Sequence, residues 1–253
     1  MPRRTPPDPA RRRCLAAGAA WLAAPVTAQA SEAPLVADVI DIPPWGLRSA
    51  DGRPAGVYAD LMQMLAERSG CALQLRLVPI LRSIVDIGHN VSQLTMMLDR
   101  KDMNDAGLLL GRVTQLPVQV WLPLGSTVRQ PEQLRGHTVA VLRGPTYHEG
   151  VQNDAGIAKW PVSSPRQQLD MLRNGRVDAA LGVEQNFLVA ARAMGLAADS
   201  FAPPLQLGSR EVRLWLAPGR AGHPCRARLV QALQSLRQDG SIARRMADAT
   251  ADD

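Results

Sequence analysis

The sequence predicts an α/β protein with two lobes, each a mostly parallel sheet flanked by helices, connected by a two-strand hinge. Two observations carry this prediction. Strand-like and helix-like segments alternate along the chain, which is typical of parallel sheets covered by helices. Two further segments, 118–123 and 212–218, both read as alternating strands that end in Trp-Leu and then Pro. We expect the chain to leave one lobe on the first of these strands and to return on the second. The alternative is that both are ordinary core strands of one sheet.

The individual elements follow from hydrophobic periodicity and from residues that start or stop helices. Strands are expected at 35–41, 73–77, 138–142 and 177–183, and helices at 57–69, 80–87, 165–172 and 224–238. Gly70, Gly88 and Gly240 mark helix ends, and Ser164 followed by Pro165 is a helix start. The segment 224–238 is expected to be the last helix.

The first 30 residues have the features of a signal peptide. Arg11, Arg12 and Arg13 precede an apolar run from Cys14 to Ala24 that is too short to span a bilayer. Ala28-Gln29-Ala30 fits the small-x-small cleavage pattern, so Ser31 is the expected mature start. The arginines also fit the twin-arginine export pattern loosely, and an amphipathic surface helix is the remaining alternative. Export to the periplasm is therefore expected, by either the general or the twin-arginine route.

The domain boundaries follow from these two arguments. We expect a signal peptide at 1–30, the first part of lobe 1 at 31–120, lobe 2 at 121–211, and the return segment of lobe 1 at 212–253. Without the signal peptide the net charge falls from +6 to +2. The remaining Lys and Arg are scattered and aromatic residues are scarce, which argues against a nucleic-acid surface.

Cysteine and histidine usage predicts no metal site and no cofactor. The four histidines, at 89, 137, 148 and 223, stand apart from each other and from the cysteines. Cys71 and Cys225 remain after cleavage of the signal peptide. They could pair in an oxidising compartment, or they could be two buried thiols.

Four motifs in sequence order resemble one known family. Pro43-Pro44-Trp45-Gly46-Leu47 leads into Gly56-Val57-Tyr58-Ala59-Asp60-Leu61, and 66–78 continues with a helix end and a strand. Leu134-Arg135-Gly136-His137-Thr138 and 172–179 follow in the second half. This order and spacing, from about Val36 to Met246, resembles the family 3 periplasmic solute-binding proteins of the polar amino-acid type, which serve ABC importers. The resemblance implies the two-lobed type II binding-protein fold and a monomer.

The chain departs from the family pattern at several places. Arg100 stands at the arginine position of the first lobe, but the Thr expected three residues before it is Met97. The segment 111–117 replaces the family's usual Phe-Ser-x-Pro-Tyr run. The family's second-lobe Asp, which binds an amino group, falls near Val183, one residue before Glu184.

The expected ligand is a small molecule with a carboxylate. Arg100 offers a bidentate fork of donors, and the Gly144–Thr146 turn is expected to offer free N–H groups at a helix start, with the Thr146 hydroxyl as a further donor. Trp45 and Tyr58 could stack on the ligand, and Glu184 could accept an ammonium group. Each of these residues also has an alternative role. Arg100 could form a salt bridge with Asp99 or Asp102, and the Gly144–Thr146 turn could be an ordinary helix cap. Trp45 and Tyr58 could belong to the core, and Glu184 could lie at a solvated helix start.

Three functions follow from the resemblance. The first is a periplasmic receptor that closes on a solute, performs no chemistry on it, and delivers it to an ABC transporter permease. The second is a sensor or accessory binding protein without a transporter. The third is an enzyme of the dehydratase type on the same fold. No Ser-His-Asp order stands out in the sequence, so an enzyme is not expected.

Overall fold

The computed structural model describes residues 1–2 and 33–251. The predicted signal peptide and the predicted start at Ser31 lie outside these described residues. Residues from Ala33 onward form one compact unit, and the fold described below is that of this unit. None of its helices is long and apolar enough to cross a membrane.

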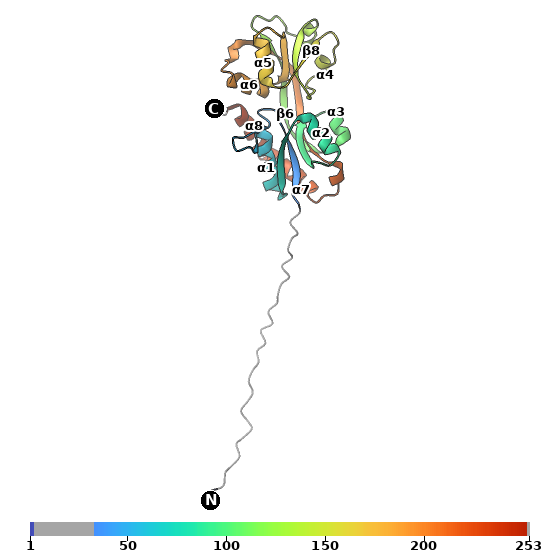
Figure 1. Cartoon of the computed structure of the whole chain (residues 1–253), viewed down its shortest axis with the longest axis vertical. Coiled ribbons are helices and arrows are strands. Elements are labelled where there is room, and N and C mark those ends of the chain that lie inside the picture. Colours follow the sequence, from blue (N-terminus) through green and yellow to red (C-terminus); the bar gives the residue numbers. More distant parts are fainter. Residues whose placement is uncertain (3–32, 252–253) are drawn as a thin grey trace. The chain divides into compact units, whose positions relative to one another are not determined.

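The first lobe is built around three parallel strands (Figure 1). β4 pairs with β1, and β1 pairs with β5, all in the parallel sense. Five helices accompany these strands, and a small hairpin of β2 and β3 lies beside them. The bounds are β1 Leu35–Ile40, β2 Leu47–Arg48, β3 Pro54–Ala55, α1 Val57–Ser69, β4 Leu73–Val78, α2 Ile80–Gly88, β5 Leu94–Leu98, α3 Lys101–Ala106, α7 Cys225–Gln238 and α8 Ser241–Ala251.

The second lobe repeats this plan with β9, β7 and β8. β7 lies between the other two and is parallel to both. The bounds are β7 Thr138–Leu142, α4 Glu149–Gln152, β8 Ala158–Val162, α5 Pro165–Arg173, β9 Ala179–Val183 and α6 Glu184–Ala193, with short 3-10 turns at Pro131–Leu134 and Ala198–Ser200. A third 3-10 turn, Pro218–Arg220, lies in the first lobe, where Gly219 donates to Asn90.

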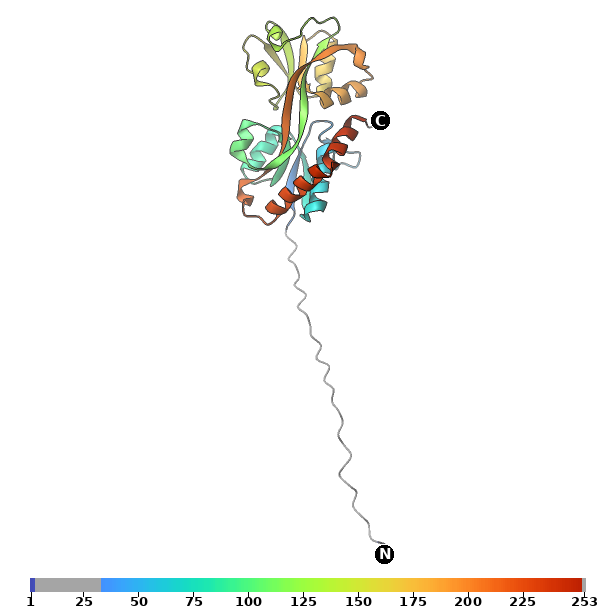
Figure 2. The same cartoon turned by 180° about the vertical axis from the view of Figure 1, so that it is seen from behind.

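Two long antiparallel strands connect the lobes. β6 spans Leu108–Pro123 and β10 spans Phe201–Leu216, and they pair from Leu108 opposite Leu216 to Pro123 opposite Phe201. Figure 2 shows both strands running side by side through the two lobes. β10 also pairs with β5 and β6 with β9, so a single eight-stranded sheet runs in the order β4-β1-β5-β10-β6-β9-β7-β8. The predicted fold class and its two-strand connection are confirmed.

The core of the first lobe follows the predicted periodicity. Val57, Leu61 and Leu65 recur at helical spacing on α1 and are at most 1 % exposed, so α1 packs this face against the sheet. Gly56 precedes the helix with a φ of 98°, and a Cβ there would meet the carbonyl oxygen of Pro44. This close approach and the positive φ explain why glycine connects the Trp45 loop to the helix.

The two long strands and the C-terminal helices differ from the prediction. β6 and β10 are much longer than the segments 118–123 and 212–218, because each strand finds a continuous partner in the other. The segment 111–117, for which no element was predicted, is part of β6. The helix 224–238 is not the last one either. Gly240, with a φ of 76°, ends the turn after α7, and α8 begins at Ser241.

A disulfide connects Cys71 to Cys225, with their Cα atoms 6.0 Å apart. Cys71 lies between α1 and β4, and Cys225 is the first residue of α7, so the bond ties the return segment to the first part of the first lobe. Of the two alternatives that the sequence left open, the structure shows the disulfide.

Candidate functional site

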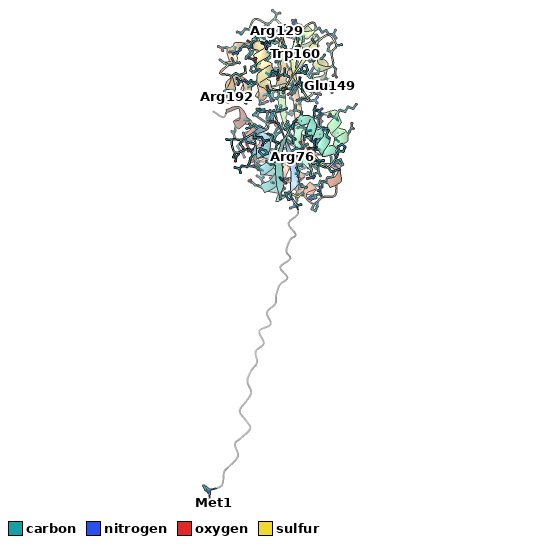
Figure 3. All side chains as sticks on the ribbon, viewed as in Figure 1. Met1, Arg76, Arg129, Glu149, Trp160 and Arg192 are labelled. Carbon is teal, nitrogen blue, oxygen red and sulfur yellow. A yellow bond between two sulfur atoms is a disulfide. The ribbon has the colours of Figure 1, made fainter. Side chains whose placement is uncertain are left out.

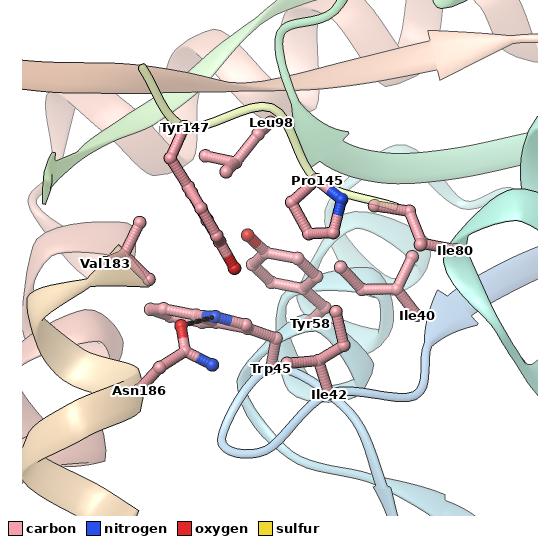
Figure 4. Close-up of a pocket in the computed structure, with 10 residues that line it drawn as sticks. All are labelled: Ile40, Ile42, Trp45, Tyr58, Ile80, Leu98, Pro145, Tyr147, Val183 and Asn186. Atoms are coloured by element: carbon pink, nitrogen blue, oxygen red, sulfur yellow. Dashed lines mark hydrogen bonds between the residues drawn. The ribbon is translucent and has the colours of Figure 1, made fainter. Parts of the chain in front are cut away.

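A small cavity lies where residues of the two lobes meet (Figure 4). The first lobe contributes residues from the end of β1, the Trp45 loop, α1, α2 and β5. The second lobe contributes the segment after β7 and the start of α6. The lining residues are Ile40, Ile42, Trp45, Tyr58, Ile80, Leu98, Pro145, Tyr147, Val183 and Asn186. The cavity volume of about 20 Å³ is room for about one water molecule.

Three aromatic side chains, those of Trp45, Tyr58 and Tyr147, line this cavity. The rings of Trp45 and Tyr58 stack with their centroids 5.3 Å apart and an interplanar angle of 24°. Figure 4 shows the hydroxyl ends of Tyr58 and Tyr147 pointing toward one another beside the Trp45 ring. Burial raises the pKa of both tyrosines far above the ordinary value, and Tyr147 adds to the effect on Tyr58. Both side chains are therefore neutral phenols at physiological pH.

Asn186 holds the two lobes together at the base of the cavity. Its Oδ1 accepts a hydrogen bond from Nε1 of Trp45 at 2.9 Å, and its Nδ2 donates to the carbonyl oxygen of Pro43 at 2.8 Å. Because Asn186 lies on α6 and both partners belong to the first lobe, these bonds require the lobes to be close together. The Asn186 amide thus has a partner for both its oxygen and its nitrogen, and the indole N–H of Trp45 has an acceptor.

Arg100 lies at the edge of the same junction, two residues after Leu98. Its Nε and Nη2 donate to the two carboxylate oxygens of Asp102 at 2.5 and 2.7 Å, in the fork geometry typical of Arg–carboxylate pairs. Its Nη1 donates to the carbonyl oxygen of Gly144 in the second lobe at 2.8 Å. The Arg100 side chain is 11 % exposed and that of Asp102 is 50 % exposed. The hydrogen bond from Arg100 lowers the pKa of Asp102.

Solved structures of similar fold were found for nearly the whole compact unit. An ancestral arginine-binding protein bound to arginine superimposes with a TM-score of 0.72 at 17 % identity, over 86 % of this chain and 98 % of that one. A histidine kinase sensor domain with similarity to periplasmic binding proteins gives a TM-score of 0.74 at 20 % identity, over 86 % and 95 %. The substrate-binding protein of an amino acid ABC transporter gives 0.69 at 14 % identity, over 85 % and 97 %.

The chain has the periplasmic binding protein fold. No protein-family model matches its sequence, and no curated protein matches it either. The identities to the solved structures are low, so these comparisons show the architecture of the chain. In this binding-protein fold the cavity at Trp45 and Tyr58 lies between the two lobes.

The structure brings four of the predicted site residues, Trp45, Tyr58, Arg100 and Gly144, to this junction. Trp45 and Tyr58 line the cavity and are also part of the core, at 3 % and 1 % exposed. Arg100 makes the salt bridge with Asp102 that was its alternative role, and it also reaches Gly144.

The Gly144–Thr146 turn differs from its prediction. Gly144 presents its carbonyl group to Arg100. No helix begins in this turn, since α4 starts at Glu149 with His148 as its cap. The N–H groups of Tyr147 and His148 both donate to Oε1 of Gln152, at 2.6 and 3.1 Å. The expectation that a helix starts at this turn is therefore wrong, and ligand contacts by Gly144 and by the Thr146 hydroxyl stay predictions.

Glu184 is the first residue of α6, directly after Val183 of the cavity wall. Its Oε1 accepts a hydrogen bond from Nε2 of Gln119 at 2.9 Å, and Oε1 of Gln119 accepts from Nε1 of Trp121. Glu184 thus belongs to a polar chain on β6 and α6. Its predicted contact with an ammonium group stays a prediction.

Sequence reasoning missed Tyr147 and Asn186. Tyr147 directly follows the Gly144–Thr146 turn, so its position was a signal that could have found it. Nothing in a single sequence distinguishes Asn186 from other polar residues of an amphipathic helix. Among the described residues, no three His, Cys, Asp or Glu side chains lie close enough together to hold a metal ion.

Proposed function

We propose that this chain is a periplasmic receptor that captures a small carboxylate-bearing molecule between its two lobes and performs no chemistry on it. The observation that carries the proposal is the position of Arg100. Its guanidinium is almost buried at the junction of the lobes and already holds a carboxylate, that of Asp102, with two parallel hydrogen bonds. A ligand carboxylate can take the place of the half-exposed Asp102 and make the same two bonds.

Binding is coupled to the movement of the lobes in this proposal. The cavity holds about one water molecule, so a larger ligand enters only when the lobes separate. Trp45 and Tyr58 then provide flat apolar surfaces for the body of the ligand. Because Arg100 also contacts Gly144 across the junction, the ligand and the second lobe meet at one guanidinium. Residues near Trp121 and Trp215, on the two connecting strands, are the proposed hinge.

Calorimetry with a carboxylate found by thermal-shift screening tests this proposal. Removing a charged partner from a desolvated pair costs about 2–5 kcal/mol, so Arg100→Ala is expected to weaken binding by about 30-fold or more. Arg100→Lys also weakens it, because a point charge does not replace a bidentate fork. Arg135→Ala is the matched control, since Arg135 pairs with Asp154 on the surface of the second lobe. Binding by Arg100→Ala within about threefold of the wild type contradicts the proposal.

We further propose that the bound molecule is delivered to an ABC importer. The similarity in fold to the substrate-binding protein of an amino acid ABC transporter supports this. The similarity to a histidine kinase sensor domain supports a sensor as the second candidate. Uptake of the labelled ligand separates the two. Deletion of the gene abolishes uptake if the chain serves an importer, whereas unchanged uptake with an altered transcriptional response indicates a sensor.

A further inference from the structure

The described residues that line the cavity carry no charged side chain. Among the described residues that form it, there is no Asp, Glu, Lys, Arg or His. The only titratable groups are Tyr58 and Tyr147, which are neutral. Trp45 and Asn186 use their polar groups on each other. An incoming ligand therefore meets aliphatic and aromatic surface and two phenol hydroxyls.

The acidic residues near the junction do not line the cavity. Asp99 pairs with Arg213 at 2.8 Å, Asp102 pairs with Arg100, and Glu184 accepts from Gln119. Asp41 lies between the lining residues Ile40 and Ile42, but its side chain is exposed and does not line the cavity. An ammonium group that enters this cavity loses its hydration shell and finds no carboxylate among the residues that line it, which is unfavourable.

We propose that the ligand is a monocarboxylate with an apolar body and no α-ammonium group, such as an aliphatic or aryl-substituted alkanoate. The inference rests on the proposed function, because Arg100 supplies the anion partner. A carboxylate exchanges with Asp102 at Arg100, while the hydrocarbon body lies against Trp45, Tyr58 and Tyr147. A zwitterionic amino acid gains the same carboxylate contact but leaves its ammonium group without a partner.

Matched pairs of probes test this class by calorimetry on the mature protein. The pairs are 3-phenylpropanoate with L-phenylalanine and 4-methylpentanoate with L-leucine, which differ within each pair only by the α-ammonium group. In at least one pair the alkanoate is expected to bind about tenfold more tightly or better. An amino acid that binds as tightly as its partner overturns the proposal, and so does the absence of binding by all four at millimolar concentration.

Two further measurements separate this inference from the proposed function. 3-Phenylpropanamide lacks the anionic charge, so equal binding of this amide overturns the role of Arg100 as well. If L-phenylalanine binds in the wild type and loses its affinity in Arg100→Ala, capture of a carboxylate stands and the proposed ligand class fails.

A variant that gains a preference for the amino acid over the alkanoate provides a positive test. Val183 lines the cavity and is 1 % exposed, so Val183→Asp introduces a carboxylate into the lining. The ratio of L-phenylalanine to 3-phenylpropanoate affinity is expected to rise about tenfold or more in this variant. An unchanged ratio in folded Val183→Asp contradicts the proposal. If the variant does not fold, the wild-type pairs decide.

Discussion

The indole N–H of Trp45 in the first lobe donates a hydrogen bond to Asn186 in the second lobe, over 2.9 Å. The same Asn186 amide donates to the Pro43 carbonyl at 2.8 Å. Trp45 is 3 % and Asn186 is 2 % exposed, so these bonds form away from solvent. One side chain of the second lobe thus satisfies two polar groups of the loop that follows β1 in the first lobe, and it favours the closed arrangement.

Substitution of Asn186 by Ala is expected to open the lobes. In the closed arrangement of Asn186→Ala, the Trp45 N–H and the Pro43 carbonyl lose their partners, and each unsatisfied group costs about 1–3 kcal/mol. The open population rises by roughly tenfold or more. Small-angle scattering of the ligand-free protein is expected to show a larger radius of gyration. Asn174→Ala is the control, because Asn174 bonds only locally to Asp170. Identical profiles for Asn186→Ala and the wild type would sink this prediction.

Gly144→Ala is expected to act on the same junction through packing. A Cβ at Gly144 would collide with Cγ2 of Ile80 in the first lobe, and the φ of Gly144 is 106°. Gly175 provides a matched control, since its φ is also positive and a Cβ there meets nothing within 4 Å. Both variants lose stability through backbone strain. Only Gly144→Ala is expected to increase the radius of gyration measured by small-angle scattering. Equal radii of gyration for the two variants refute the packing argument.

The ion pair between Arg100 and Asp102 is expected to make the stability of the protein depend on pH. The hydrogen bond from Arg100 lowers the pKa of Asp102 below its ordinary value of 3.8. A lowered pKa in the folded state means that the ionised carboxylate stabilises the protein above pH 3.8, and that this contribution is lost as the pH falls through the folded-state pKa. Because Asp102 is half-exposed, the effect is below about 1 kcal/mol. Asp102→Asn is expected to be less stable than the wild type at neutral pH, and the gap should close in acid. A gap that is constant with pH speaks against it.

The disulfide between Cys71 and Cys225 is expected to contribute to stability. It joins residues 154 positions apart, and removal of a native disulfide typically costs about 2–5 kcal/mol. Urea unfolding of the protein with and without reductant measures this cost, with the double variant Cys71→Ser, Cys225→Ser as a second sample. Both are expected to unfold at lower urea concentration than the oxidised wild type. Coincident transitions, or free thiols at Cys71 and Cys225 in the native protein, would show that the bond does not contribute.

The fold could be predicted because its signals are local. Helical spacing at Val57, Leu61 and Leu65 placed α1, and Ser164 with Pro165 placed the start of α5, where the Ser164 side chain accepts from the N–H of Gln167. The lengths of β6 and β10 could not be predicted, because each strand is extended by its partner in the other half of the chain. Strand pairing between distant segments leaves little trace in a single sequence.

The candidate site was predicted less completely for a related reason. Arg100, Trp45 and Tyr58 carry side chains whose chemistry suggests a role wherever they lie. Asn186 gains its role from the position of α6 opposite the Trp45 loop, and Gly144 from its approach to Ile80 and Arg100. These relationships arise only when the lobes come together.

The central claim, that a small carboxylate binds between the lobes beside Trp45, is tested most directly by NMR. The indole Nε1–H signal of Trp45, assigned with Trp45→Phe, is followed while 3-phenylpropanoate is added to the nitrogen-15-labelled protein. Trp160 is the internal reference, because it lies on β8 in the second lobe and is half-exposed (Figure 3). The account predicts a saturable shift of the Trp45 signal with the calorimetric Kd and a constant Trp160 signal. A Trp45 signal that stays in place at calorimetric saturation would contradict it.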